Sequence, residues 1–136
     1  MNLLKSMMIA AAGMTAQGAR MRVVAENMAN ANSTPQTKGA DPYRRKVPVF
    51  KNELDRAMGV DLVKVNKVVP DNSSFGMRFE PGHPAADAQG YVKTPNVNSL
   101  VEMMDMRDAE RSYEAGLNVI SAARGMMART IDLLRS

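Results

Sequence analysis

The chain contains no cysteine, no tryptophan and a single histidine, and aromatic residues make up only 4% of its 136 positions. The absence of cysteine excludes disulfides, cysteine-ligated zinc and thiol nucleophiles. The shortage of aromatic residues argues against a core built around large rings. Methionine is abundant instead, with 13 copies in a chain that is 45% apolar. Because methionine is flexible and fills irregular gaps, this composition favours helices packed on helices.

Sequence motifs that carry catalysis are also lacking. There is no glycine-rich phosphate loop, no paired metal-ligand spacing and no Gly-x-Ser-x-Gly elbow. The single histidine, His83, lies between Gly82 and Pro84 with no nucleophile nearby, which indicates a loop residue that packs or forms hydrogen bonds. We therefore predict a protein that is not an enzyme, with no catalytic residues and no cofactor or metal site.

Concentrated charge is missing as well. The net charge of +4 arises from three basic and one acidic residue in 1–32, ten and seven in 33–95, and five and six in 96–136. A nucleic-acid-binding domain usually gathers its basic residues on one face, so we expect no nucleic-acid partner.

Long apolar runs are absent too. None approaches the ~20 residues of a transmembrane helix, and we expect no direct membrane insertion. The apolar stretch 7–12 continues in the same pattern through Gln17 and Arg20, which favours a structural helix over a cleaved signal peptide.

Two regions show the periodicity of long helices. The first covers residues 2–31, where a large residue recurs every seven positions beside a line of small ones that includes Gly18. The large residues of this line are Met7, Met14, Met21 and Met28. Small residues at this spacing allow a partner backbone to approach closely, and Gly18 costs about 1 kcal/mol in a helix interior unless packing requires it.

The second periodic region covers residues 99–135. Its large residues are Met106, Tyr113, Ile120, Met127 and Leu134, and its small ones are Ala109, Gly116 and Ala123. Ser99 and Glu102 predict a capping box at its start. We interpret the acidic residues of 102–114 as a solvated face with arginines as local partners.

All seven prolines lie between these helices, in residues 33–95. Alternating valines predict short strands near 47–49 and at 60–69, a turn at 71–74, a returning strand at 75–79 and a loop over 80–96. The fold class is therefore mainly α: two long terminal helices packing as an antiparallel coiled coil, with a short irregular or β-hairpin middle. The predicted segments are 1–32, 33–95 and 96–136.

The length of the second helix constrains the shape of the molecule. A helix of about 36 residues is ~54 Å long, whereas a compact chain of this size is roughly 37 Å across. The molecule must be elongated, and two helices cannot cover one another's apolar surfaces. A helical hairpin, a homodimer and a polymer all remain open on this argument.

Three groups of motifs resemble the flagellar basal-body rod protein family. The end of the first helix, residues 26–34, contains Asn27, Asn30 and Thr34 and is similar to a signature shared by rod and hook proteins. Residues 42–46, 82–87 and 90–92 resemble the small proximal-rod type. Residues 95–98, beginning with Pro95 and Asn96, and then 102–103 and 111–115, resemble the rod-protein C-terminal signature. Residues 35–41 are an insertion relative to many relatives and leave the path of 33–45 open.

The resemblance implies a structural subunit of the proximal rod, the drive shaft that transmits torque for motility. Its partners would be other rod proteins, copies of itself and the flagellar type III export apparatus. The subunit would be exported without a cleaved signal peptide into a rod that crosses the periplasm. Tyr43, Arg44 and Arg45 combine an aromatic ring with two guanidinium groups, as interface hot spots do, and we expect them to contact neighbouring subunits.

A rival interpretation belongs to another class of protein. A type III-secreted helical hairpin could act as an adaptor or as a membrane-active factor. A membrane role would favour a continuous apolar face flanked by basic residues. The small-residue lines on both helices favour packing against protein instead.

Overall fold

The computed structural model describes residues 2–136, so residue 1 of the predicted N-terminal segment lies outside the described residues. The elements are α1 (Leu3–Ala29), β1 (Lys46–Asp55), β2 (Val60–Pro70), β3 (Gly76–Phe79), β4 (Tyr91–Thr94) and α2 (Ser99–Arg135). The prediction of a mainly helical chain with two long terminal helices and a short β-containing middle is confirmed.

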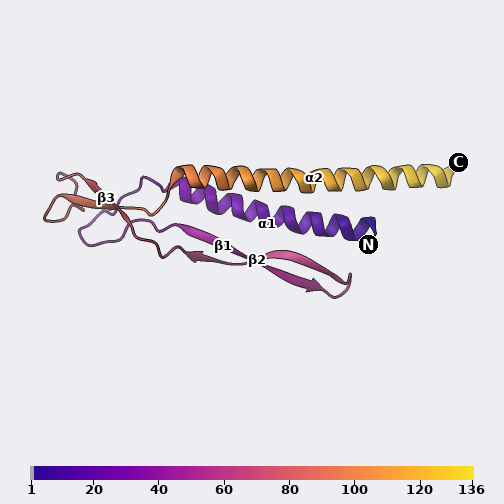
Figure 1. Cartoon of the computed structure of the whole chain (residues 1–136), viewed down its shortest axis with the longest axis horizontal. Helices are drawn as coiled ribbons and strands as arrows, with labels where there is room; N and C mark the ends of the chain where they lie inside the picture. The colour runs from indigo at the N-terminus through magenta and orange to yellow at the C-terminus, as the bar shows by residue number, and fades with distance from the viewer. Residues whose placement is uncertain (1) are drawn as a thin grey trace.

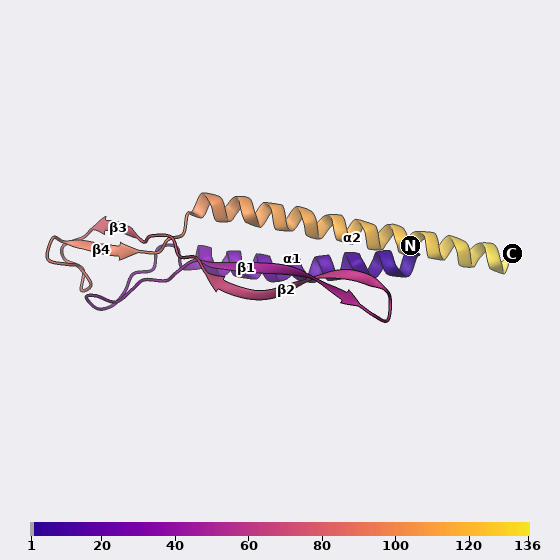
Figure 2. The same cartoon turned by 60° about the horizontal axis from the view of Figure 1, so that its bottom comes forward.

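The molecule is elongated, with α1 lying between α2 and the β1–β2 hairpin (Figure 1). The two helices run antiparallel, and both chain ends lie at one end of the molecule (Figure 2). The β3–β4 hairpin and its loops form a tip at the opposite end, beyond the helices. The helices pack directly on one another, while their description as a coiled coil stays a prediction.

Asparagine side chains cap the helices. Asn2 Oδ1 accepts the backbone N–H of Lys5 at 2.8 Å, and Asn30 Nδ2 donates to the Glu26 carbonyl at 2.9 Å. The predicted capping box at the start of α2 is wrong. Asn98, one residue earlier, is the N-cap and accepts the backbone N–H of Leu100 at 3.0 Å. Asparagine is as strong an N-cap as serine, and the carboxylate of the predicted box points into the interior instead.

The middle segment forms two separate antiparallel hairpins. β1 pairs with β2 from Lys46 opposite Pro70 to Asp55 opposite Val60, with a bulge between Val49 and Phe50. β3 does not return onto β2 as predicted. It pairs with β4, with Phe79 opposite Tyr91, inside the segment predicted to be a loop.

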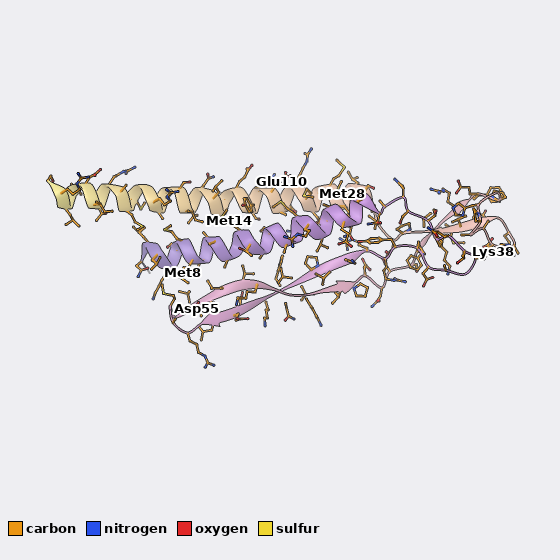
Figure 3. All side chains as sticks on the ribbon, turned by 180° about the vertical axis from the view of Figure 1, so that it is seen from behind. Met8, Met14, Met28, Lys38, Asp55 and Glu110 are labelled. Carbon is orange, nitrogen blue, oxygen red and sulfur yellow. The ribbon has the colours of Figure 1, made fainter. Side chains whose placement is uncertain are left out.

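The core is thin and consists of small side chains. Ala16, Val23 and Val24 of α1 are buried, as are Ala109 and Ala123 of α2. Gly116 lies between the two α2 alanines along the same line. A Cβ atom there would stand 2.6 Å from Met14 Cγ and 3.3 Å from the Ala10 carbonyl oxygen of α1. Figure 3 shows Met14 in the space between the helices. The small line of α2 therefore faces α1 of the same chain.

The helices differ in length. α2 has 37 residues and α1 has 27, so α2 extends past the start of α1 by ten residues, or ~15 Å. We call residues 126–135 the C-terminal overhang, which is visible beyond the N-terminus in Figure 1. Its apolar side chains are open, and Leu133 and Leu134 are 76% and 82% exposed.

We expect the C-terminal overhang to unfold locally before the rest of the helical layer, because a segment with few packed neighbours opens at low free-energy cost. Limited trypsin digestion of the monomer should cleave after Arg129 well before it cleaves after Arg20. Arg20 is a suitable internal reference because it lies in α1 and pairs with Asp105 of α2 at 3.4 Å. Mass spectrometry of the fragments measures the rate of cleavage at each site. Equal rates at the two sites would contradict this packing.

Two glycines of α2 should respond oppositely to alanine. No atom lies within 4 Å of a Cβ at Gly125, so Gly125→Ala should raise the free energy of unfolding by about 1 kcal/mol through helix propensity. Gly116→Ala must displace Met14 or the α1 backbone, and overpacking should lower it by about 1–3 kcal/mol. Urea unfolding followed by circular dichroism measures both. A stabilised Gly116→Ala protein would show that the helices are farther apart.

Candidate functional site

Polar side chains converge where the end of α1, the start of β1, the segment after β2 and the start of α2 meet. The helices and the hairpin hold them there, because each element contributes residues from its end nearest the tip. We call this cluster the polar junction; its members are Arg20, Asn27, Tyr43, Arg45, Asp71, Asn96, Glu102 and Asp105.

Asn27 is the hub on the α1 side and is 1% exposed. Its Nδ2 donates to the Lys46 carbonyl at 2.9 Å, and its Oδ1 accepts the Lys46 backbone N–H at 3.0 Å. The hydroxyl of Tyr43 donates to the same Oδ1 at 2.7 Å. Asn27 therefore pairs with the chain as a neighbouring strand would, and it fixes the first residue of β1 against α1.

Glu102 is the hub on the α2 side, and its carboxylate is fully buried. Its Oε2 accepts from Asn27 Nδ2 at 3.2 Å, and its Oε1 accepts from Arg45 Nε. A buried carboxylate needs a cation and hydrogen-bond donors to offset its lost hydration. Arg45 and Asn27 supply both, so the charge of Glu102 binds α2 to β1 and to α1 together.

Arg45 spans three carboxylates. Besides Glu102, its guanidinium reaches Asp71 Oδ2 at 3.2 Å and Asp105 Oδ2 at 3.3 Å. Burial opposes the charged form of Arg45, but the hydrogen bond and charge of Glu102 outweigh it and raise the pKa of Arg45. A Lys side chain would not reproduce this, since the planar fork of Arg is what meets several acceptors at once.

The segment after β2 is held by the same cluster. Asn96 Oδ1 accepts the backbone N–H of Arg45 at 2.7 Å, and its Nδ2 donates to the Asp71 carbonyl at 3.0 Å. Arg44 also donates to the Asp71 carbonyl, at 2.8 Å, and its guanidinium lies 4.2 Å from the centre of the Phe75 ring. These contacts turn the chain away from β2, which explains why the following strand pairs elsewhere.

These surroundings shift the pKa of two titratable groups, Asp71 and Tyr43. The backbone N–H of Ser73 donates to Asp71 Oδ1 at 2.8 Å and lowers the pKa of Asp71, with Arg45 adding to the effect. Burial, reinforced by the charge of Glu26, raises the pKa of Tyr43. Ionisation of Asp71 therefore stabilises the fold above its unfolded pKa, and that contribution is lost as the pH falls through its lower folded pKa.

A separate contact joins the loop after α1 to the tip. His83 Nδ1 accepts the backbone N–H of Ala85 at 3.0 Å, so the neutral ring carries its proton on Nε2. That nitrogen lies 3.0 Å from Thr34 Oγ1 and donates to it. Pro95, which follows β4, is buried. The family-motif residues thus lie near the junction or at the base of the tip, where chain segments are held together.

We expected Tyr43, Arg44 and Arg45 to contact neighbouring subunits. In the single chain their polar groups form hydrogen bonds and ion pairs with other residues of the same chain. A role between subunits stays a prediction for them. Glu102 and Asp105 are not the solvated face that we expected, because one is buried and the other half-buried. Sequence reasoning missed them, since Arg45 and Glu102 are separated by 57 residues and no local pattern links them.

The predicted helix-packing residues divide into two groups. Met7, Met14 and Met21 are half-buried along α1, as are Met106 and Ile120 along α2. The exposed ones are Met28, Tyr113, Met127 and Leu134. Gly18, expected to admit a partner backbone, lies in a shallow groove with Tyr113 and Ile120 and has no atom within 4 Å of a Cβ. It is open in the single chain, and an assembly role for these residues stays a prediction.

The donors and acceptors of the junction pair with one another in hydrogen bonds and ion pairs. Across residues 2–136, no cluster of three His, Cys, Asp or Glu side chains is arranged to hold a metal ion. The geometry describes a clamp that joins four chain segments.

Sequence comparison identifies the class of this clamped helical hairpin. Residues 88–133 match the family described as flagellar basal body rod FlgEFG protein C-terminal. The chain is 54% identical over 128 residues to the flagellar basal-body rod protein FlgC of Agrobacterium fabrum, covering 94% of this chain and 92% of the relative. FlgC of Escherichia coli O6:H1 is 40% identical over 133 residues, or 98% of each chain.

A less similar relative also matches over almost the whole chain. FlgC of Bacillus subtilis is 34% identical over 143 residues, covering 94% of this chain and 95% of the relative. The chain therefore belongs to the FlgC family of flagellar basal-body rod proteins. The resemblance drawn from the motifs is confirmed.

We predict that Glu102→Ala lowers the free energy of unfolding by about 3 kcal/mol, because it leaves the half-buried Arg45 without its main acceptor and the buried Asn27 with one acceptor fewer. Glu102→Gln should lower the free energy of unfolding by less, since it keeps an oxygen that accepts a hydrogen bond from Arg45. Glu53→Ala is the control: Glu53 pairs with Lys64 at 2.6 Å, but both side chains are exposed, so little should change. Urea unfolding is the measurement, and equal effects of Glu102→Ala and Glu53→Ala would refute the clamp.

Proposed function

We propose that this chain is a structural subunit of the bacterial flagellar basal-body rod, at its proximal end, where it assembles with other rod proteins and with copies of itself. The observation that carries the proposal is the match to FlgC proteins over 94–98% of the chain. A match of that extent covers the helices, the hairpins and the polar junction together.

The surface of the helices supports an assembly role. Along α2, large apolar side chains stay exposed over its whole length; they include Leu100, Met104, Leu117, Met126, Ile131 and Leu133. Large apolar side chains exposed in such number along one helix usually mark contact with other proteins. In the assembled rod we expect the terminal helices to form a coiled-coil layer, with the partners of α2 supplied by neighbouring subunits.

The clamp supports the mechanical part of the proposal. A subunit that transmits torque must resist relative movement of its segments. The ion pairs of Arg45 with α2 and Asp71, together with the hydrogen bonds of Asn27 from α1, hold both helices and the hairpin at one point. The role is non-catalytic, with no cofactor. Export would proceed through the flagellar type III apparatus without a cleaved signal peptide, and residues 7–12 belong to the continuous helix α1.

The rival role as a secreted adaptor or membrane-active factor has less support. Among the described residues, no helix is both long enough and apolar enough to cross a bilayer. The relatives that match almost the whole chain are named for the rod. Co-sedimentation with liposomes of bacterial phospholipids separates the two roles, because a rod subunit should remain in the supernatant.

Deletion of the gene tests the proposal in the cell. We expect cells without this chain to lose swimming in soft agar and to form no complete rod, as seen by electron microscopy of purified basal bodies. A plasmid copy of the wild-type chain should restore both. The Glu53→Ala variant is a matched control for expression and should also restore both, because it changes an exposed side chain of the hairpin, outside the helices and the polar junction. Normal rods in the deletion strain would overturn the proposal.

A further inference from the structure

The tip is attached to the rest of the molecule by few contacts. Within residues 2–136, neither β3 nor β4 packs against a helix or against the β1–β2 hairpin, and Figure 2 shows the tip beyond the ends of those elements. Side chains of residues 76–94 reach instead to the loop after α1, residues 33–42. The position of the tip therefore depends on how that loop is held against it.

Two polar side-chain contacts join the loop after α1 to the tip. In the first, Lys93 Nζ lies 3.2 Å from Asp41 Oδ1, but the two side chains are 46% and 64% exposed, and an exposed ion pair contributes little to stability. In the second, His83 of the tip contacts Thr34, and both residues are half-buried beside the buried Pro35. The contact of His83 with Thr34 is therefore the main polar link between the loop and the tip.

Both ring nitrogens of His83 take part in this link. Nδ1 accepts the backbone N–H of Ala85 at 3.0 Å, and Ala85 is buried, so its N–H has little access to another acceptor. Nε2 carries the ring hydrogen and lies 3.0 Å from Thr34 Oγ1, which accepts it. The ring holds both segments at once only in its neutral form with the hydrogen on Nε2.

The backbone of His83 is held on both sides of the ring. Its N–H donates to the Glu80 carbonyl at 3.0 Å, and its carbonyl accepts the N–H of Ala86 at 3.0 Å. When the hydrogen bonds of the ring change, the side chain moves more readily than the backbone that carries it.

Charged groups surround this contact without binding the ring. The segments around His83 carry Lys38, Asp41, Arg78, Glu80, Asp87 and Lys93. The carboxylates of Asp41 and Glu80 pair with neighbouring basic side chains, and that of Asp87 accepts two backbone N–H groups of its own loop. Over the described residues, no carboxylate forms a hydrogen bond or ion pair with the ring. A protonated ring would therefore have no acidic partner in its present position.

We propose that His83 is a pH-sensitive latch between the tip and the loop after α1. A proton binds to the lone pair of Nδ1 that accepts the N–H of Ala85, so both ring nitrogens become donors. The two N–H groups then face each other, the ring turns out of its position, and Nε2 leaves Thr34. The tip is joined to the loop when the ring is neutral and released when it is protonated, in the range of about pH 5 to 8 where histidine changes charge. This device acts on the tip alone and goes beyond the proposed rod function.

NMR of the chain labelled with nitrogen-15 histidine tests the tautomer directly, because His83 is the only histidine. At about pH 7.5, Nε2 should carry the single ring hydrogen, and at about pH 5 both nitrogens should carry one. Exchange of the Ala85 amide hydrogen, relative to an unstructured chain at the same pH, should become about fivefold faster at the lower pH, as expected for the loss of one hydrogen bond. The Leu100 amide is the internal reference, since it donates to Asn98 Oδ1 at 3.0 Å and that acceptor does not titrate.

Two variants identify the titrating group. His83→Asn keeps an uncharged oxygen that can accept the N–H of Ala85, so exchange of this amide, corrected in the same way, should not depend on pH. Residues 36–40 of the loop should become more mobile at about pH 5 in the wild-type chain by nitrogen-15 relaxation, and equally mobile at both pH values in His83→Asn, which cannot reach Thr34. Asp41→Asn removes the charge of the exposed ion pair and should keep the full response of Ala85 to pH.

Several results would overturn the latch. A ring hydrogen on Nδ1 at about pH 7.5, or a ring that is still neutral at about pH 5, would each contradict it. The same holds if Ala85 stays equally protected after the ring is protonated, or if its response to pH survives in His83→Asn. Circular dichroism should show the same helix content in all variants at both pH values, because the tip lies apart from the helices. A loss of helix content at about pH 5 in both the wild-type chain and His83→Asn would assign the response to general unfolding and refute the latch.

Discussion

The buried carboxylate of Glu102 is the constraint on which the rest of the structure depends. A charge without access to water must be matched by a cation and by donors, and Arg45 and Asn27 provide them from two other segments. Satisfying that one group sets where β1 starts, how α2 leaves the tip and which end of α1 meets it. Such a polar cluster specifies one arrangement of the helices, whereas a seam of methionine and alanine would accept several.

At the opposite end of the molecule, α1 is too short to cover the apolar side chains of α2. The start of α1 falls ten residues short of the end of α2, and the small side chains between the helices allow close packing only along one line. Apolar side chains therefore remain exposed at this end in the single chain. The polar junction fixes one end of the molecule, whereas the other end needs neighbouring subunits to bury its apolar surface. A rod subunit needs this combination, because it must keep its shape while adding to a growing polymer.

The sequence periodicity predicted the local secondary structure. The seven-residue repeats located both helices within two residues of their observed ends, and the line through Gly116 was recognisable from its spacing. Long-range pairings were not predictable, since nothing near Arg45 or Glu102 indicates that they meet. The partner of β3 was missed for the same reason: local alternation marks a strand but does not say what it pairs with. At Gly18 the close approach of a backbone was expected from the sequence, and within the single chain that space is empty.

In the free chain, local stability should decrease from the polar junction toward the C-terminal overhang. We expect neighbouring subunits to order the overhang on assembly. Hydrogen exchange of the free chain, compared with the same chain in purified rods, measures it most directly. Amides of 23–27, 45–47 and 102–109 should be protected in both states, whereas those of 117–135 should gain protection only on assembly. Uniform protection of the free chain, or no gain at the C-terminal overhang in rods, would contradict the account.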